Sequence, residues 1–147
     1  VFFDGEYADH KIELYELSEP IPFDKMKPSS IPFLELLGKS GAVLQPIKCG
    51  GENSLDQKRE QWTDGANALA LAPGKIIGYD RNYKTLDALK NAGYQILSPE
   101  KFLTDVDHWK QTYEKYIITI SGSEMVRGRG GMRCLTLPLG REEHASA

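Results

Sequence analysis

Short runs of alternating or clustered apolar residues along the chain predict strands. Between residues 11 and 17, Ile12, Leu14 and Leu17 alternate with charged residues, which is the period of a strand with one buried face. The turn sequence Pro73-Gly74 between two apolar runs predicts a hairpin. In all, the pattern predicts strands at 1–4, 11–17, 43–48, 67–72, 75–79, 94–97, 116–120 and 135–139.

Helical spacing and capping residues predict the helices between these strands. Four prolines between residues 19 and 32 indicate a connecting loop, at whose end Ser29-Ser30 offers an N-cap and Pro32 fits an early helical position. Helices are predicted from 33 to a glycine at 38 or 41, over 54–62, over 83–91 between an N-cap at Asn82 and Gly93, and once or twice within 98–115.

The order of these elements indicates the fold class. Strand, strand, helix and strand follow one another across residues 68–97, which is typical of an α+β module. Such a module is one unit of a larger arrangement and not a whole fold. The sequence therefore predicts the α+β class.

Composition and charge exclude several classes of protein. The chain has 147 residues, with 18 Lys and Arg against 21 Asp and Glu, so its net charge of −3 gives no basic footprint for nucleic acid or an anionic membrane. Apolar runs such as 66–73 are far shorter than the ~20 residues of a membrane-spanning helix. Two cysteines and three scattered histidines form neither a disulfide scaffold nor a zinc spacing. We expect one domain with no nucleic-acid partner, no membrane and no metal.

The segment with the clearest chemistry is 127–134, Arg-Gly-Arg-Gly-Gly-Met-Arg-Cys. Three glycines and three arginines in seven residues predict no regular element, and glycine lets the backbone approach a ligand closely. Arginines offer planar donors for a carboxylate, and guanidinium groups beside Cys134 would favour a nucleophilic thiolate. The same residues fit a phosphate-binding or flexible loop with an inert Cys134, although no Walker pattern is present. The residues alone leave both interpretations open.

Three collinear blocks resemble the bacterial arginine deiminases, a family of the guanidine-modifying pentein superfamily. The first is Arg-Glu-Gln-Trp-Thr-Asp-Gly-Ala-Asn at 59–67, continued by Leu-Ala-Leu-Ala-Pro-Gly at 69–74. The second is Gly-Tyr-Asp-Arg-Asn-Tyr-Lys-Thr at 78–85. The third runs over 121–139, contains the glycine-rich segment and is followed by Arg141. Three blocks in order are far more specific than any single motif.

The resemblance implies a fold and a reaction. The fold is a pentein-type α/β propeller of ββαβ modules around a pseudo-fivefold axis. The reaction is hydrolysis of the guanidinium group of L-arginine to citrulline and ammonia, without metal or organic cofactor. A Cys attacks the guanidinium carbon, ammonia leaves, and water cleaves the covalent thiouronium with a His as acid and base. Two carboxylates grip the guanidinium, because a buried cation must be paired.

The resemblance also implies roles for residues of this chain. Cys134 matches the nucleophile. Gly128, through its backbone carbonyl, and Arg129 match loop positions that touch or gate the substrate. Met132 replaces the Pro or Ala usual before Arg-Cys, which bears on the rigidity of the loop. Asp64 is interpreted as a turn residue before glycine in preference to a substrate carboxylate.

We expect residues 1–147 to be the carboxyl-terminal portion of a single catalytic domain, with 98–117 as an insertion because this stretch is longer than the family's connection. The family's His and carboxylates are then expected upstream of Val1. L-arginine is the expected partner in a cytoplasmic enzyme, and a homo-oligomer is allowed. Two alternatives stay open: another guanidine-modifying pentein acting on agmatine, methylarginine or peptidyl-arginine, and a non-catalytic pentein-like binding domain.

Overall fold

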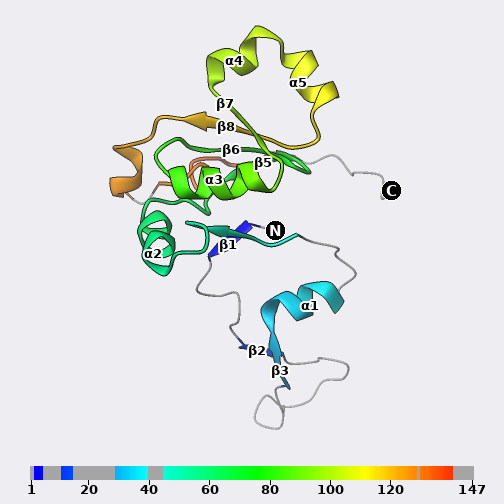
Figure 1. Ribbon diagram of the computed structural model, residues 1–147, viewed down its shortest axis with the longest axis vertical. Coiled ribbons are helices and arrows are strands. Elements are labelled where there is room, and N and C mark those ends of the chain that lie inside the picture. The colour runs from blue at the N-terminus through cyan, green and yellow to red at the C-terminus, as the bar shows by residue number, and fades with distance from the viewer. Residues whose placement is uncertain (1, 5–10, 15–28, 40–44, 129, 141–147) are drawn as a thin grey trace.

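The structure is a computed structural model that describes residues 2–4, 11–14, 29–39, 45–128 and 130–140. The strands are β1 (Phe2–Asp4), β2 (Lys11–Leu14), β3 (Ser29–Pro32), β4 (Ile47–Cys49), β5 (Leu69–Ala72), β6 (Lys75–Tyr79), β7 (Gln95–Leu97) and β8 (Tyr116–Ile120). The helices are α1 (Phe33–Lys39), α2 (Ser54–Trp62), α3 (Tyr83–Asn91), α4 (Pro99–Thr104), α5 (Val106–Thr112) and the 3-10 helix η3 (Met125–Gly128). Figure 1 shows α3 lying along the sheet formed by the later strands.

A mixed four-stranded sheet in the order β5-β6-β8-β7 forms the body of the fold. β5 runs antiparallel to β6, whereas β6 and β7 both run parallel to β8. The sequence of β8, Tyr-Ile-Ile-Thr-Ile, is apolar and β-branched toward both faces, which suits a strand with a neighbour on each side. The α+β class, the predicted hairpin and the strand over 116–120 are therefore confirmed.

One face of the sheet packs against α3. Ile76 and Ile117 lie opposite each other on β6 and β8, and both contact the cluster formed with Leu89 of α3 and Ile47 of β4. Leu89 is fully buried, as the apolar spacing of the helix predicts. Gly93 follows the helix with a φ of +90°, which confirms the predicted C-terminal glycine.

Two groups of residues pack against the opposite face of the sheet. Tyr116 and Ile118 of β8 pack against aromatic side chains of α4 and α5. At the carboxyl ends of β6 and β8, Tyr79 packs against Val126 and Met132, which belong to the segment after β8. This second contact places the glycine-rich segment at the carboxyl edge of the parallel strands.

The amino-terminal strands form two small sheets. β1 pairs in parallel with β4, and β2 pairs antiparallel with β3. The prediction of a loop over 19–32 is wrong for its last four residues, because Ser29–Pro32 form β3 and so do not begin the helix. Pro32, which has no N–H to donate, is tolerated here because a two-stranded sheet gives β3 an edge outside the ladder. Residues 19–28 lie outside the described residues.

The predicted strand at 135–139 is not formed. The chain turns at residues 132–135 and continues without strand pairing as far as residue 140. Leu137 and Leu139 are 81% and 94% exposed. Their alternation predicted a strand, but a strand needs a hydrogen-bonded neighbour, and the described residues supply none for this segment.

The order β5, β6, α3, β7 gives the predicted succession of strand, strand, helix and strand, although β8 lies between β6 and β7 in the sheet. The range 98–117 contains α4, α5 and the first two residues of β8. Within the described residues, no helix combines the length and apolarity needed to cross a membrane.

Candidate active site

Cys134 lies in the turn that ends the glycine-rich segment, and its side chain is exposed. The other cysteine, Cys49, is fully buried and accepts a hydrogen bond from the Thr85 hydroxyl at 3.4 Å. Arg127 and Gly128 belong to η3, so the expectation that this segment holds no regular element is wrong at its start. The two cysteines thus differ sharply in access, and Cys134 is the one that a dissolved reagent or substrate can reach.

Among the described residues, Asn67 donates a side-chain hydrogen bond to the Cys134 sulfur. Its Nδ2 donates to Cys134 Sγ at 2.9 Å, while its Oδ1 accepts the backbone N–H of Arg133 at 3.1 Å. Gly131 allows this approach, because a Cβ built there would lie 2.1 Å from both Cγ and Nδ2 of Asn67. One amide therefore holds the sulfur and the backbone beside it, and a glycine provides the space.

Tyr79 holds the glycine-rich segment at a second point. Its hydroxyl donates to the carbonyl oxygen of Gly130 at 2.6 Å, and its side chain is 3% exposed. Burial raises the pKa of the Tyr79 phenol, and the negative charges of Asp64 and Cys134 raise it further. The phenol therefore stays protonated, and able to donate, throughout the neutral pH range.

The turn that carries Asn67 is held by backbone hydrogen bonds. Gly65 donates to the Glu60 carbonyl at 2.7 Å, Asp64 to that of Gln61 at 3.1 Å, and Asn67 to that of Asp64 at 3.0 Å. Asp64 has a φ of +58°, a conformation that Asp tolerates better than most residues. Its Oδ2 is buried and has no hydrogen-bond partner among the described residues. Asp64 thus occupies the turn position that the sequence favoured.

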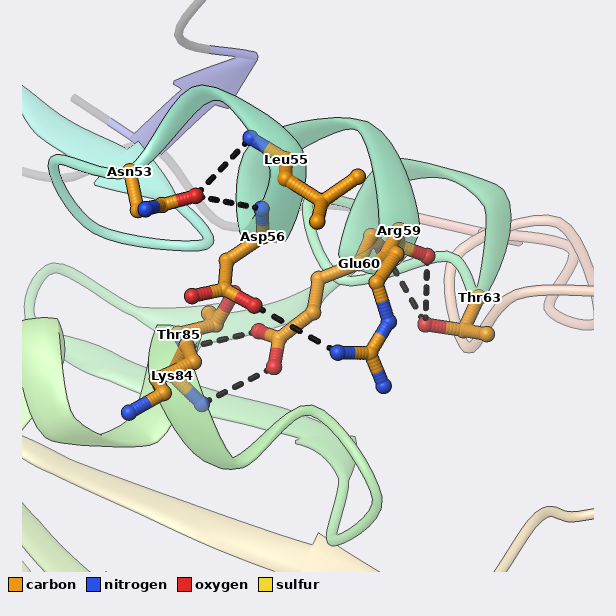
Figure 2. A network of polar contacts seen from close by, with 8 residues as sticks. All are labelled: Asn53, Leu55, Asp56, Arg59, Glu60, Thr63, Lys84 and Thr85. Carbon is orange, nitrogen blue, oxygen red and sulfur yellow. Dashed lines mark hydrogen bonds and ion pairs between the residues drawn. The ribbon is translucent and has the colours of Figure 1, made fainter.

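A polar network joins α2 to α3 close to this turn (Figure 2). Glu60 of α2 is 5% exposed, and its carboxylate accepts the backbone N–H groups of Lys84 at 2.9 Å and Thr85 at 2.7 Å. Asn82 takes the predicted N-cap position of α3 but makes no capping hydrogen bond with its side chain. Its amide donates instead to the Thr63 carbonyl at 3.1 Å. The predicted capping role of Asn82 is therefore wrong, and Glu60 performs it.

The described arginines of the glycine-rich segment have partners other than Cys134. The Arg127 guanidinium pairs with the Glu124 carboxylate at 3.2 Å on the surface. Arg133 Nη1 donates to the Thr136 carbonyl at 3.4 Å. The hydrogen-bond donor that the structure describes at the sulfur is a neutral amide, and the third arginine of the segment, Arg129, lies outside the described residues.

The two predicted substrate-binding positions differ in what the structure says of them. Gly128 is exposed at the end of η3, and a Cβ placed there would meet no atom within 4 Å. Arg129 lies outside the described residues. Gly128 and Cys134 thus share one segment, with an open surface at the glycine.

The described histidine, His108, is exposed on α5, where its ring contacts Trp109 and Tyr113 and its Nδ1 lies 3.3 Å from the Thr112 hydroxyl. His10 and His144 lie outside the described residues. In the part of the chain that the structure describes, no three His, Cys, Asp or Glu side chains gather as a metal site would require. His108 is thus a surface residue.

Sequence reasoning did not single out Asn67 or Tyr79 as site residues, although both lie in the quoted blocks. A signal was available in the predicted hairpin. Leu69 pairs with Ile77, so the start of β5 and the end of β6 lie at the same end of the hairpin. Asn67 just before β5 and Tyr79 at the end of β6 therefore lie at the same end of the hairpin, and both contact the glycine-rich segment.

Comparison with known proteins relates this chain to one family. The family model described as arginine deiminase matches residues 29–141. The arginine deiminase of Mycoplasma capricolum subsp. capricolum is 42% identical over 111 residues, covering 75% of this chain and 22% of the relative. That of Listeria monocytogenes serotype 4a is 43% identical over 96 residues, covering 65% and 18%. That of Streptococcus agalactiae serotype V is 39% identical over 111 residues, covering 74% and 22%.

The chain belongs to the arginine deiminase family, because the family model covers more than half of it. The chain spans about a fifth of the length of the curated relatives it matches. The family is thus established for this chain, whereas the activity of the whole protein is a matter for the proposal below.

Proposed function

We propose that the protein carrying this sequence hydrolyses the guanidinium group of L-arginine to citrulline and ammonia, with Cys134 as the nucleophile. The thiolate adds to the guanidinium carbon and a C–S bond forms. A proton reaches the departing nitrogen, the C–N bond breaks, and ammonia leaves an S-alkylthiouronium. Water then adds to the same carbon and gives one proton back to the group that protonated the ammonia. The C–S bond breaks, the oxygen loses its second proton to solvent, and citrulline and the thiolate are released.

The observation that carries the proposal is the exposed Cys134 sulfur held at 2.9 Å by the Asn67 amide, at the end of the glycine-rich segment of a chain in this family. A nucleophile needs access and a fixed position, and the buried Cys49 has no access. Gly128 is exposed, and the free space around it supports a role for its carbonyl as a hydrogen-bond acceptor for the substrate. From the family resemblance we assign Arg129 a role in touching or gating the substrate.

We further propose that the chain supplies one part of a pentein-type propeller. The succession β5, β6, α3, β7 supports this proposal, since it has the order of one ββαβ unit. The proton carrier and the carboxylates that pair the guanidinium are then supplied by residues beyond the described ones, in line with the short span of the chain against its relatives. A free, exposed thiol at Cys134 supports a reducing, cytoplasmic location.

The test is citrulline release from L-arginine by the complete protein that carries this sequence, with agmatine assayed in parallel. Cys134→Ala is expected to abolish turnover and to leave the far-UV circular dichroism spectrum unchanged. Cys49→Ala, the matched control at the buried thiol, is expected to retain turnover within about tenfold. Citrulline formation by Cys134→Ala within about tenfold of the wild type would remove the nucleophile assignment. Turnover of agmatine alone would favour the alternative pentein substrate.

Two further arms of this experiment separate the chain from the complete site. The 147-residue chain alone is expected to release no citrulline, because attack on a resonance-stabilised guanidinium needs proton delivery and paired carboxylates. A chimera is made from the Mycoplasma capricolum relative by replacing its matching segment with this chain. The chimera is expected to release citrulline, and Cys134→Ala in the chimera is expected to abolish the release. Cys134-dependent turnover by the isolated chain would show that it holds its own acid and base.

A further inference from the structure

We infer that Asn67 is a positioning residue for the nucleophile: its amide fixes the Cys134 sulfur and the backbone of the glycine-rich segment relative to each other. This inference rests on the proposed role of Cys134. The two residues are 67 positions apart in the chain, and their contact joins the turn before β5 to the turn after η3.

The argument begins with the two ends of the amide. Nδ2 donates to Cys134 Sγ at 2.9 Å and Oδ1 accepts from the Arg133 N–H at 3.1 Å, so donor and acceptor are used together on adjacent residues. A carboxylate of the same shape could accept from Arg133 but could not donate to the sulfur. Only an amide satisfies both contacts.

The Asn67 side chain is itself held on two sides. Its backbone N–H donates to the Asp64 carbonyl at 3.0 Å, which fixes the base of the side chain in the turn. Gly131 lies so close that a Cβ there would fall 2.1 Å from the amide nitrogen, and so the glycine-rich segment forms one wall for the amide. The residue is half-buried and has little room to move away from the sulfur.

This restraint bears on the rate of attack. A nucleophile reacts efficiently when its reacting atom is held in a near-attack position, and a displacement of about 1 Å lowers the rate by on the order of 100-fold. Without the Asn67 donor, the exposed Cys134 side chain is free to leave the position that the amide defines. We therefore expect the loss to fall on the chemical step and not on substrate binding.

The test compares Asn67→Asp with the wild type in the complete protein that carries this sequence. Asn67→Asp keeps the shape and the acceptor for Arg133 but removes the donor to the sulfur. We expect kcat for L-arginine to fall about 100-fold and KM to change less than about threefold. Asn53→Asp is the matched control, since Asn53 caps α2 through its Oδ1 and aspartate caps equally well.

A second readout reports the contact directly and does not need turnover. The rate of Cys134 carboxymethylation by iodoacetamide is followed against pH by peptide mass spectrometry. In Asn67→Ala, which introduces no charge, the rise of this rate is expected to move to higher pH, because the sulfur loses a hydrogen-bond donor that favours the thiolate. A residue that only stabilised the fold would leave this pH profile in place, as Asn53→Asp is expected to do.

The outcomes separate this inference from the proposed function. Wild-type turnover that survives Cys134→Ala would overturn the proposed function. Turnover that depends on Cys134, together with a kcat for Asn67→Asp within about threefold of the Asn53→Asp control and an unchanged pH profile for Asn67→Ala, would overturn the role of Asn67 alone. Should Asn67→Asp fail to fold, Asn67→Ala is assayed instead, and a kcat within about threefold of the wild type would equally overturn it.

Discussion

The Glu60 carboxylate satisfies the amino terminus of α3, and its replacement is expected to lower the stability of the fold. It is 5% exposed and accepts two backbone N–H groups at the first turn of α3, from Lys84 at 2.9 Å and Thr85 at 2.7 Å. The first N–H groups of a helix have no partner within the helix, so a buried acceptor there removes an unsatisfied donor pair. Glu60→Gln perturbs this site with almost no change of shape.

The magnitude follows from the geometry. In Glu60→Gln one of the two acceptor oxygens becomes an NH₂ group that can only donate, so one backbone N–H of α3 faces a donor. A hydrogen bond to a charged group contributes about 1.5–3 kcal/mol, and a carboxylate at a helix amino terminus about 0.3–1 kcal/mol more. We therefore expect the free energy of unfolding to fall by about 2–4 kcal/mol. For the 147-residue chain unfolding as one unit, that corresponds to a Tm lower by roughly 6–12 °C.

The assay is thermal and urea unfolding followed by far-UV circular dichroism at neutral pH. Glu52→Gln is the control: its carboxylate also lies near α2, but it is 84% exposed and pairs with Lys48 on the surface. Removing an exposed pair is expected to change the free energy of unfolding by less than about 1 kcal/mol. Equal Tm values for Glu60→Gln and Glu52→Gln would refute the claim that this carboxylate stabilises α3.

Two further predictions concern the residues around Cys134. Gly131→Ala is expected to lower the free energy of unfolding, measured in urea, by about 2 kcal/mol, because its Cβ displaces the Asn67 amide from two hydrogen bonds. The control Gly140→Ala, whose Cβ has open space around it, should change the free energy of unfolding by less than about 0.5 kcal/mol. Equal effects of the two substitutions would contradict the packing of Gly131 against Asn67. Burial raises the pKa of Tyr79, so the folded state keeps a proton that the unfolded chain loses above about pH 10. The free energy of unfolding should therefore fall as the pH rises past that point, and less steeply in Tyr79→Phe; identical slopes would contradict this.

The elements that sequence reasoning predicted well are those fixed by local chemistry. The hairpin of β5 and β6 follows from the Pro73-Gly74 turn between apolar runs, and Gly74 indeed has a φ of +73°. The helix α3 and its closing Gly93 follow from spacing and from the left-handed conformation that glycine adopts easily. In both cases the determining residues are neighbours in the chain, so that the pattern alone contains the information.

The failures concern partners that are distant in sequence. Asn82 has the ordinary N-cap side chain, but Glu60 reaches the helix from 24 residues away and leaves Asn82 to bond Thr63. The apolar alternation ending at Leu139 predicted a strand, but pairing depends on a neighbouring edge that a local pattern cannot specify. A local pattern thus indicates that a residue can cap a helix or that a segment can form a strand. Whether it does so depends on the neighbouring elements in the folded protein.

The three sequence blocks that carry the family resemblance are joined in space by side-chain hydrogen bonds. Glu60 of the first block caps the helix that the second block begins, and Asn67 of the first block bonds Arg133 and Cys134 of the third. Tyr79 of the second block bonds the Gly130 carbonyl of the third. Every pair of blocks is therefore connected, and two of the three connections end on the glycine-rich segment. Apart from the end of η3 and the turn at residues 132–135, this segment is fixed by side chains from β6 and from the turn before β5, which bond the Gly130 carbonyl and the Arg133 N–H.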